Sequence, residues 1–216
     1  MKVFVIGANG QVAHHFADFI KNDDTIEEIA MIRDTDQKPF FEERDIETVH
    51  LDLVKNPIDN LAHAMKGSDA VLFSAGAGGS GYDQTVLIDL DGAVKAMTAA
   101  EQAGIKRFVM VSTFRTGREE ISKVNDLQIY TIAKHYADEW LKNRTNLDWT
   151  IVHPGILVNS EGTNQIKIGH DLDVNEIPRQ DVARVLLEVL KNNDTIKKEF
   201  EVLAGNDSVE EALSKL

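Results

Sequence analysis

Residues 2–13 read KVFVIGANGQVA, and this stretch decides the fold. The apolar run from Lys2 to Ile6 is typical of a buried β-strand, and residues 12–20 carry apolar side chains at helical spacing. Between them, Gly7, Gly10 and Ala13 match the pattern G-x-x-G-x-x-A. There the first glycine permits a tight turn, the second admits a pyrophosphate, and the small third residue lets the helix pack close to the strand.

The loop and the helix N-terminus after it are therefore expected to bind a dinucleotide, because free N–H groups and a partial positive charge favour an anion there. The contacts expected from this stretch are Gly7, Asn9, Gly10, Gln11 and Val12. The alternative is a tight turn without a ligand, and the position of the motif at a first strand–helix junction favours binding.

Outward from this unit, strand-like and helical patterns alternate along the chain. Strands are expected at 29–32, 49–53, 70–73, 107–112, 149–152 and 200–203, and helices at 58–65, 83–103, 127–143, 181–191 and 209–216. Residues 153–177 read as irregular. The alternation predicts an α/β protein with a doubly wound parallel sheet, the Rossmann fold. We expect a single domain over 1–216, with residues 153–216 forming a small substrate-side region.

The composition limits the classes of partner that the chain is expected to bind. The chain has 216 residues and a formal net charge of -13, which disfavours binding to nucleic acid. It has no cysteine, which excludes disulfides and thiol chemistry, and its seven histidines form no metal-ligand pattern. No signal peptide is evident, and no apolar run approaches the ~20 residues of a membrane helix. These features predict a cytoplasmic protein without a metal, a membrane or a nucleic-acid partner.

The cofactor is predicted from the end of the second strand, where Arg33 is followed by Asp34. A guanidinium suits the 2′-phosphate of NADP, so NADP(H) is preferred. The alternative is that Asp34 binds the ribose of NAD(H) and Arg33 is solvated. Further cofactor contacts are expected after the third strand, at Asp52 and Leu53, and after the fourth, at Ser74, Ala75 and Gly76.

A proton-transfer pair is predicted at Tyr130 and Lys134, which the i, i+4 spacing puts on one helix face. A phenol is a poor base at neutral pH, and a nearby ammonium favours its charged form. Ser112, at the end of the fifth strand, is expected to hold a substrate oxygen. The alternative is a tyrosine that packs on the core and a solvated lysine.

The sequence resembles the atypical short-chain dehydrogenase/reductase family, in its NAD(P)H-binding or NmrA-like branch, related to flavin and biliverdin reductases. The segments that carry the resemblance are GANGQVA at 7–13, IDLDGAVKAMTAAEQAGIKRFVMVST at 88–113, YTIAKHYADEWL at 130–141, LDWTIVHPG at 147–155 and IPRQDVA at 177–183. The resemblance implies that Gly7, Gly10 and Arg33 bind the cofactor. It implies an active-site set of Ser112, Tyr130 and Lys134, with Lys134 also contacting the cofactor. It also implies that the backbone of Pro154, Gly155 and Ile156 lies beside the nicotinamide.

The chain departs from the resemblance in three places. The interval from Ser112 to Tyr130 is long, His153 stands where relatives usually have arginine, and the C-terminal part is short for a nucleotide-sugar substrate. The charged run 115–126 reads as a solvated loop, with a mobile lid as the alternative.

The function expected is reduction of a small carbonyl, quinone or flavin by NAD(P)H. The alternatives are a non-enzymatic redox sensor and an NAD-dependent isomerase or epimerase. A monomer or a homodimer is expected, since the apolar helix faces around 85–100 and 132–141 suit either a dimer or packing on the sheet. The partner expected is a small-molecule substrate.

Overall fold

The computed structural model describes residues 1–21 and 23–216, and its centre is a nine-stranded sheet in the order β11-β8-β10-β6-β5-β4-β1-β2-β3. The strands from β3 to β10 in that order are parallel. They are β1 (Lys2–Ile6), β2 (Glu27–Ile32), β3 (Glu47–His50), β4 (Ala70–Phe73), β5 (Arg107–Val111), β6 (Asp148–Pro154) and β10 (Lys198–Ala204). The prediction of a doubly wound Rossmann-type sheet is confirmed.

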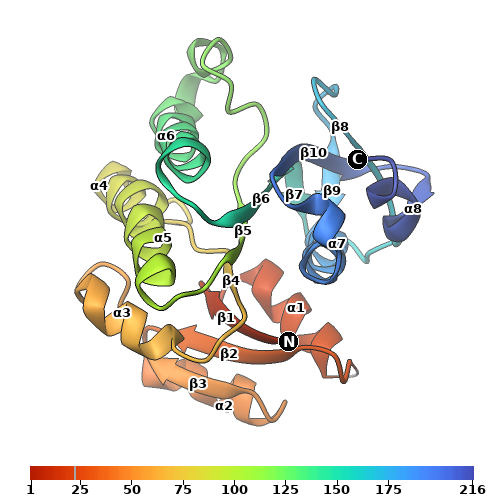
Figure 1. The fold of residues 1–216 in the computed structure, drawn as a ribbon. Helices are drawn as coiled ribbons and strands as arrows, with labels where there is room; N and C mark the ends of the chain where they lie inside the picture. The colour runs from red at the N-terminus through yellow and green to blue at the C-terminus, as the bar shows by residue number, and fades with distance from the viewer. Residues whose placement is uncertain (22) are drawn as a thin grey trace.

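Helices cover both faces of the sheet (Figure 1). One face packs on α1 (Gln11–Ile20) and α7 (Arg179–Lys191), through apolar residues such as Phe16 and Leu186. The other packs on α3 (Ile58–Met65), α5 (Ala93–Gln102) and α6 (Gln128–Arg144). The central strands are buried on both faces, which explains their continuous apolar runs.

Short elements complete the chain. They are α2 (Lys38–Glu42), α8 (Val209–Leu213) and the 3-10 turns η1 (Thr35–Gln37), η3 (Ile121–Lys123), η4 (Asn125–Leu127) and η5 (Asn193–Thr195). None of the helices in the described part of the chain is long and apolar enough to cross a membrane.

The prediction that residues 153–177 are irregular is wrong. This stretch contains β7 (Ile156–Val158), β8 (Gln165–Gly169) and the start of β9 (Glu176–Pro178). β8 pairs antiparallel with β10 and with β11 (Asp207–Ser208), while β7 and β9 form a separate parallel ladder. These strands are short, and their partners are distant in sequence, so local periodicity does not reveal them.

The long helix predicted over 83–103 is present, but its winding changes along its length. The chain forms α4 (Tyr82–Gln84), then a π-helical stretch η2 (Thr85–Gly92), and only then α5. A π-helix winds more widely than an α-helix, and such turns are frequent at functional sites. Apolar spacing in a short segment does not separate the two windings, so the sequence shows a helix but not its kind.

Candidate dinucleotide and substrate cleft

In the glycine loop, the backbone of Gly7 lies close against the backbone of Ala75. Gly7 has a φ of 83°, and a Cβ atom there would lie 2.6 Å from the backbone of Ala75. The N–H of Gly10 donates to the carbonyl oxygen of Gly7 at 2.9 Å, which closes the turn. Helix α1 begins immediately after Gly10, with no side-chain cap and no acidic residue in its first turn. Its first N–H groups therefore suit the pyrophosphate of a dinucleotide.

Two adjoining hollows meet at this loop and share Gly10, Ser74, Ala75 and Gly76. The first, of about 700 Å³, includes Gly7, Asn9, Arg33, Asp52 and Leu53. The second, of about 790 Å³, includes Gln11, Val12, Ser112, Tyr130, Lys134, Pro154 and Gly155. The sequence-predicted residues are thus brought together along one cleft, except Ile156, which lines neither hollow and is 55% exposed.

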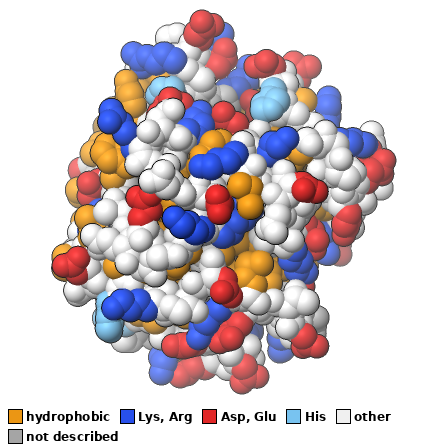
Figure 2. Space-filling model, in the orientation of Figure 1, with side chains coloured by type: hydrophobic (Ala, Val, Ile, Leu, Met, Phe, Trp, Pro, Cys, Tyr) orange, Lys and Arg blue, Asp and Glu red, His pale blue; other side chains and the backbone are white. Residues whose placement is uncertain are grey.

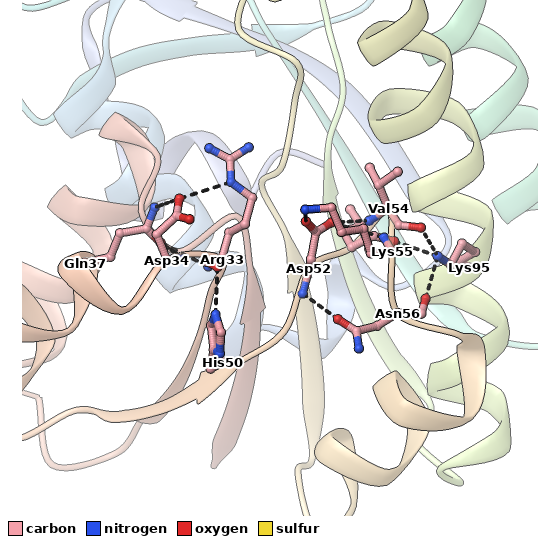
Figure 3. A network of polar contacts seen from close by, with 10 residues as sticks. Arg33, Asp34, Gln37, His50, Asp52, Val54, Lys55, Asn56 and Lys95 are labelled. Carbon is pink, nitrogen blue, oxygen red and sulfur yellow. Dashed lines mark hydrogen bonds and ion pairs between the residues drawn. The ribbon is translucent and has the colours of Figure 1, made fainter.

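The first hollow begins at the end of β2 (Figure 3). Arg33 and Asp34 both donate their backbone N–H to the Gln37 side chain, so the turn after β2 is fixed. The Arg33 side chain is 65% exposed, and its Nε lies 3.2 Å from Asp34 Oδ2. The guanidinium is available to a phosphate, while a carboxylate lies beside it.

The opposite wall of this hollow is the turn after β3 (Figure 3). Asp52 accepts from the backbone N–H groups of Val54 and Lys55. Partial burial raises the pKa of Asp52, but these bonds and the Lys55 ammonium outweigh it and lower the pKa below its ordinary value. The Lys95 ammonium donates to the carbonyl oxygens of Leu53, Val54 and Asn56. These bonds hold the turn after β3 in place as one wall of the first hollow.

The second hollow contains the predicted Tyr130 and Lys134. The Lys134 Nζ lies 5.8 Å from the centre of the Tyr130 ring and is almost fully buried. It forms an ion pair with Asp89 at 3.1 Å and donates to the carbonyl oxygens of Val111 and Ala75. Burial lowers the pKa of Lys134, but the electrostatic effects of Tyr130 and Asp89 outweigh burial. The net pKa is raised above its ordinary value, so the side chain stays an ammonium.

Asp89 is a site residue that the sequence analysis missed. It lies on η2 with no exposed surface, and its second carboxylate oxygen accepts the N–H of Ala77 at 3.0 Å. It thereby joins the π-helix to the loop after β4 and to Lys134 on α6. An acidic residue within an apolar helical run is the signal that was available for it.

A second missed group lies beneath Ser112, which follows β5. The Ser112 Oγ is 2.7 Å from Asp138 Oδ2, and both residues are buried. Burial raises the pKa of Asp138, although His153, Ser112 and Lys134 partly offset it. Asp138 follows Lys134 by four positions and Tyr130 by eight, so helical spacing places all three on one face of α6.

His153 connects this group to the next strand. Its Nδ1 lies 2.8 Å from the carbonyl oxygen of Thr113 and its Nε2 lies 3.4 Å from Glu199. Burial lowers the pKa of His153, but Glu199 and Asp138 outweigh it and raise it. The hydrogen bond to His153 and the nearby Lys142 lower the pKa of Glu199 to about 2. His153 is thus a buried, paired residue.

The run 115–126 lies in the connection from β5 to α6. Arg115 donates to the carbonyl oxygen of Leu172, and Asp126 lines the second hollow. Among residues 1–21 and 23–216, no His, Asp and Glu side chains gather in a group of three that suits a metal ion.

A parallel sheet, a glycine loop before an uncapped helix and a cleft across the strand ends define a Rossmann-type dinucleotide-binding protein. The sequence profile of the NAD(P)H-binding family matches residues 7–193, and the chain belongs to this family. The expected membership of an NAD(P)H-binding family is thereby confirmed.

Relatives with differing names align along the whole chain. The uncharacterized sugar epimerase YhfK of Bacillus subtilis is 42% identical, with all of both chains covered. A structure named as an NAD-dependent epimerase/dehydratase from Bacillus halodurans is 39% identical, with a TM-score of 0.92 and both chains covered completely. The oxidoreductase ylbE of Lactococcus lactis is 32% identical, with a TM-score of 0.91, covering all of this chain and 96% of that one.

A more distant structure, the anaerobilin reductase ChuY of Escherichia coli O157:H7, shares the fold. It is 18% identical, with a TM-score of 0.80, over 94% of this chain and 97% of that one.

Proposed function

We propose that this protein is an NADPH-dependent reductase of a small carbonyl, quinone or flavin acceptor. The observation that carries the proposal is the second hollow, where Ser112, Tyr130 and Lys134 line the same space as the glycine loop. A cofactor placed on that loop would bring its nicotinamide end towards these side chains.

Bound NADPH would supply the hydride. With a carbonyl acceptor, Tyr130 would donate its phenolic proton to the substrate oxygen, so that the reduced product is an alcohol. Ser112, whose hydroxyl is also bonded to Asp138, would hold that oxygen by a hydrogen bond when Asp138 is protonated. Lys134 acts on the phenol through its charge, because its ammonium already donates to Asp89, Val111 and Ala75 in the wall.

The preference for NADP(H) rests on Arg33. Its guanidinium lines the first hollow and is largely exposed, which suits bidentate binding of a 2′-phosphate. Asp34 opposes this preference through its charge and would suit the ribose hydroxyls of NAD(H). We propose NADP(H) as the preferred cofactor, with NAD(H) bound more weakly.

The names of two relatives raise epimerisation as the competing function. An epimerase returns its hydride to the substrate, so the cofactor shows no net oxidation. A redox sensor binds the cofactor without turnover. The proposed reductase differs from both because it consumes NADPH in proportion to product.

The direct experiment is a spectrophotometric assay of NADPH oxidation with 9,10-phenanthrenequinone, FMN and 4-nitrobenzaldehyde as separate acceptors. The proposal predicts steady oxidation with at least one acceptor and formation of an equal amount of reduced product. Tight binding of NADPH with no oxidation by any class of acceptor would favour the sensor. Exchange of label within a sugar nucleotide, with constant NADPH, would favour the epimerase.

We also propose that the chain forms a homodimer through η2 and α6. Large apolar side chains are exposed on both elements, including Val86, Leu87, Tyr136 and Trp140. Figure 2 shows orange side chains along the edge of the molecule where these helices lie in Figure 1. Light scattering coupled to size exclusion tests this, and Trp140→Glu is expected to yield monomers.

A further inference from the structure

Three charged side chains line the second hollow, and they differ in whether an opposite charge is paired with them. They are Asp126, Lys134 and Arg179. Lys134 is buried and neutralised by Asp89 at 3.1 Å. Asp126 also lines the hollow and is exposed. Among the described residues, Arg179 is therefore the cation of this hollow that is not paired with a carboxylate.

Arg179 is held in place by neutral groups. It is the first residue of α7, and its Nη1 donates to the carbonyl oxygen of Leu157 at 3.0 Å and to Asn159 Oδ1 at 2.7 Å. Both acceptors come from β7 or the residue after it, which the β7–β9 ladder brings beside the start of the helix. The guanidinium is thus oriented without losing its charge.

The nearest acidic residue on the same helix is committed elsewhere. Asp181 is buried and accepts the backbone N–H groups of Thr163 and Asn164. Arg179 is partly buried, and its bonds among the described residues are made by Nη1 to neutral acceptors, which leaves Nε and Nη2 without a carboxylate partner there. These two nitrogens form one edge of the guanidinium, which is the edge that matches two oxygens of an anion.

The remaining wall is mainly apolar or small, with Val12, Val111, Leu127 and Leu157 among its side chains. The net charge of -13 repels anions in general, so an unpaired cation in a concave, largely apolar hollow selects where an anion can bind. Figure 2 shows blue side chains near the middle of a face on which red side chains are also widespread.

We propose that Arg179 binds the anionic end of the substrate, so that the acceptor is an apolar carbonyl compound carrying a carboxylate or a phosphate. This inference rests on the proposed reductase function for its second half, while the anion site itself is independent of turnover. Arg179 then sets specificity: it orients the substrate in the hollow that Tyr130 and Ser112 also line.

The test uses binding to the NADP⁺ complex of the full chain, in which no hydride can pass to an aldehyde. Three probes are compared by isothermal titration calorimetry: 4-carboxybenzaldehyde, 4-formylphenyl phosphate and the neutral 4-formylbenzamide. The proposal predicts that at least one anion binds roughly 10- to 100-fold more tightly than the amide, as expected for a charge-assisted pair. Which anion gains identifies the carboxylate or the phosphate as the ligand.

Arg179→Gln is expected to abolish that advantage while the affinity for the amide and for NADPH is unchanged. Arg184→Gln is the matched control on the same helix, because Arg184 packs over the Phe19 ring and does not line the hollow. Asn159→Ala, which removes one anchor of Nη1, is expected to weaken anion binding partly. This variant keeps the test decisive if Arg179→Gln is poorly folded.

Equal binding of the three probes by the wild type, or no binding, would overturn the anion site. A loss of NADPH affinity in Arg179→Gln would overturn it too, because Arg179 would then belong to the cofactor. Selective anion binding without NADPH oxidation by either aldehyde would sustain the site and count against the reductase, so the two failures are distinguishable.

Discussion

The Ser112 hydroxyl and the Asp138 carboxylate lie 2.7 Å apart in the interior, at the point where β5 meets α6. The direction of this hydrogen bond decides what Ser112 offers to a substrate. When Asp138 is ionised, Ser112 donates to it and faces the cleft as an acceptor. When Asp138 is protonated, its hydroxyl donates to Ser112, and Ser112 is free to donate to a carbonyl oxygen.

Reduction of a carbonyl is therefore predicted to depend on the protonation of Asp138. Burial raises the pKa of Asp138, so the protonated form persists above the ordinary carboxyl range. We expect kcat/KM for an aldehyde to fall as the pH rises through that raised pKa. In Asp138→Asn, the amide N–H donates to Ser112 at every pH, so this limb of the pH profile should disappear. An unchanged profile in Asp138→Asn would contradict the account.

Tyr130→Phe is predicted to lower kcat by about 100- to 10,000-fold, the range typical of a lost general acid. The affinity for NADPH should stay within a factor of two or three of the wild type, since the phenol does not hold the glycine loop. Tyr136→Phe is the matched control, because Tyr136 is on the same helix and half exposed. Steady-state kinetics and NADPH fluorescence separate the two effects. If Tyr130→Phe still reduced a flavin but no longer reduced a carbonyl, hydride delivery to the flavin would not need the tyrosine.

Glu28 carries a prediction about stability. It lies on β2, is 2% exposed, and neither carboxylate oxygen has a hydrogen-bond partner in the described residues. Burial raises the pKa of Glu28 from 4.5 to about 8. A raised carboxyl pKa means that the folded state binds a proton more tightly, so the free energy of unfolding falls as the pH rises from 4.5 to about 8.

Glu28→Met removes this titration and keeps the side-chain length. We expect the variant to be more stable than the wild type by about 3 kcal/mol near pH 7, with little difference below pH ~4. Urea unfolding across this pH range measures it. Glu27→Gln is the control, since Glu27 is exposed and pairs only at the surface with Lys2. Parallel pH curves for the wild type and Glu28→Met would refute the prediction.

The fold was predictable from the sequence where the elements are long and periodic. The strand before Gly7, the glycine loop and helices such as α7 follow from local patterns that tertiary structure does not reverse. The antiparallel strands β8 and β11 were not, because a strand of a few residues near the edge of a sheet is specified by its partners rather than by its own sequence.

The shared location of Tyr130 and Lys134 in one hollow was predictable from their helical spacing, and their roles stay a prediction. Asp89 and Asp138 were missed because their roles arise from burial against other elements. Arg179 was missed for the same reason: its importance depends on Leu157, on Asn159 and on the absence of a nearby carboxylate among the described residues.

The glycine loop and Arg33 are proposed to bind a nicotinamide dinucleotide. The decisive measurement is a titration of the wild type and of Arg33→Ala with NADPH and then NADH, followed by nicotinamide fluorescence. The wild type should bind NADPH more tightly than NADH. Arg33→Ala should lose affinity by roughly 10- to 100-fold for NADPH alone, as expected when a charge-assisted phosphate contact is removed. Equal affinities unchanged by the substitution would contradict the assignment of Arg33, and binding of neither cofactor would contradict the account as a whole.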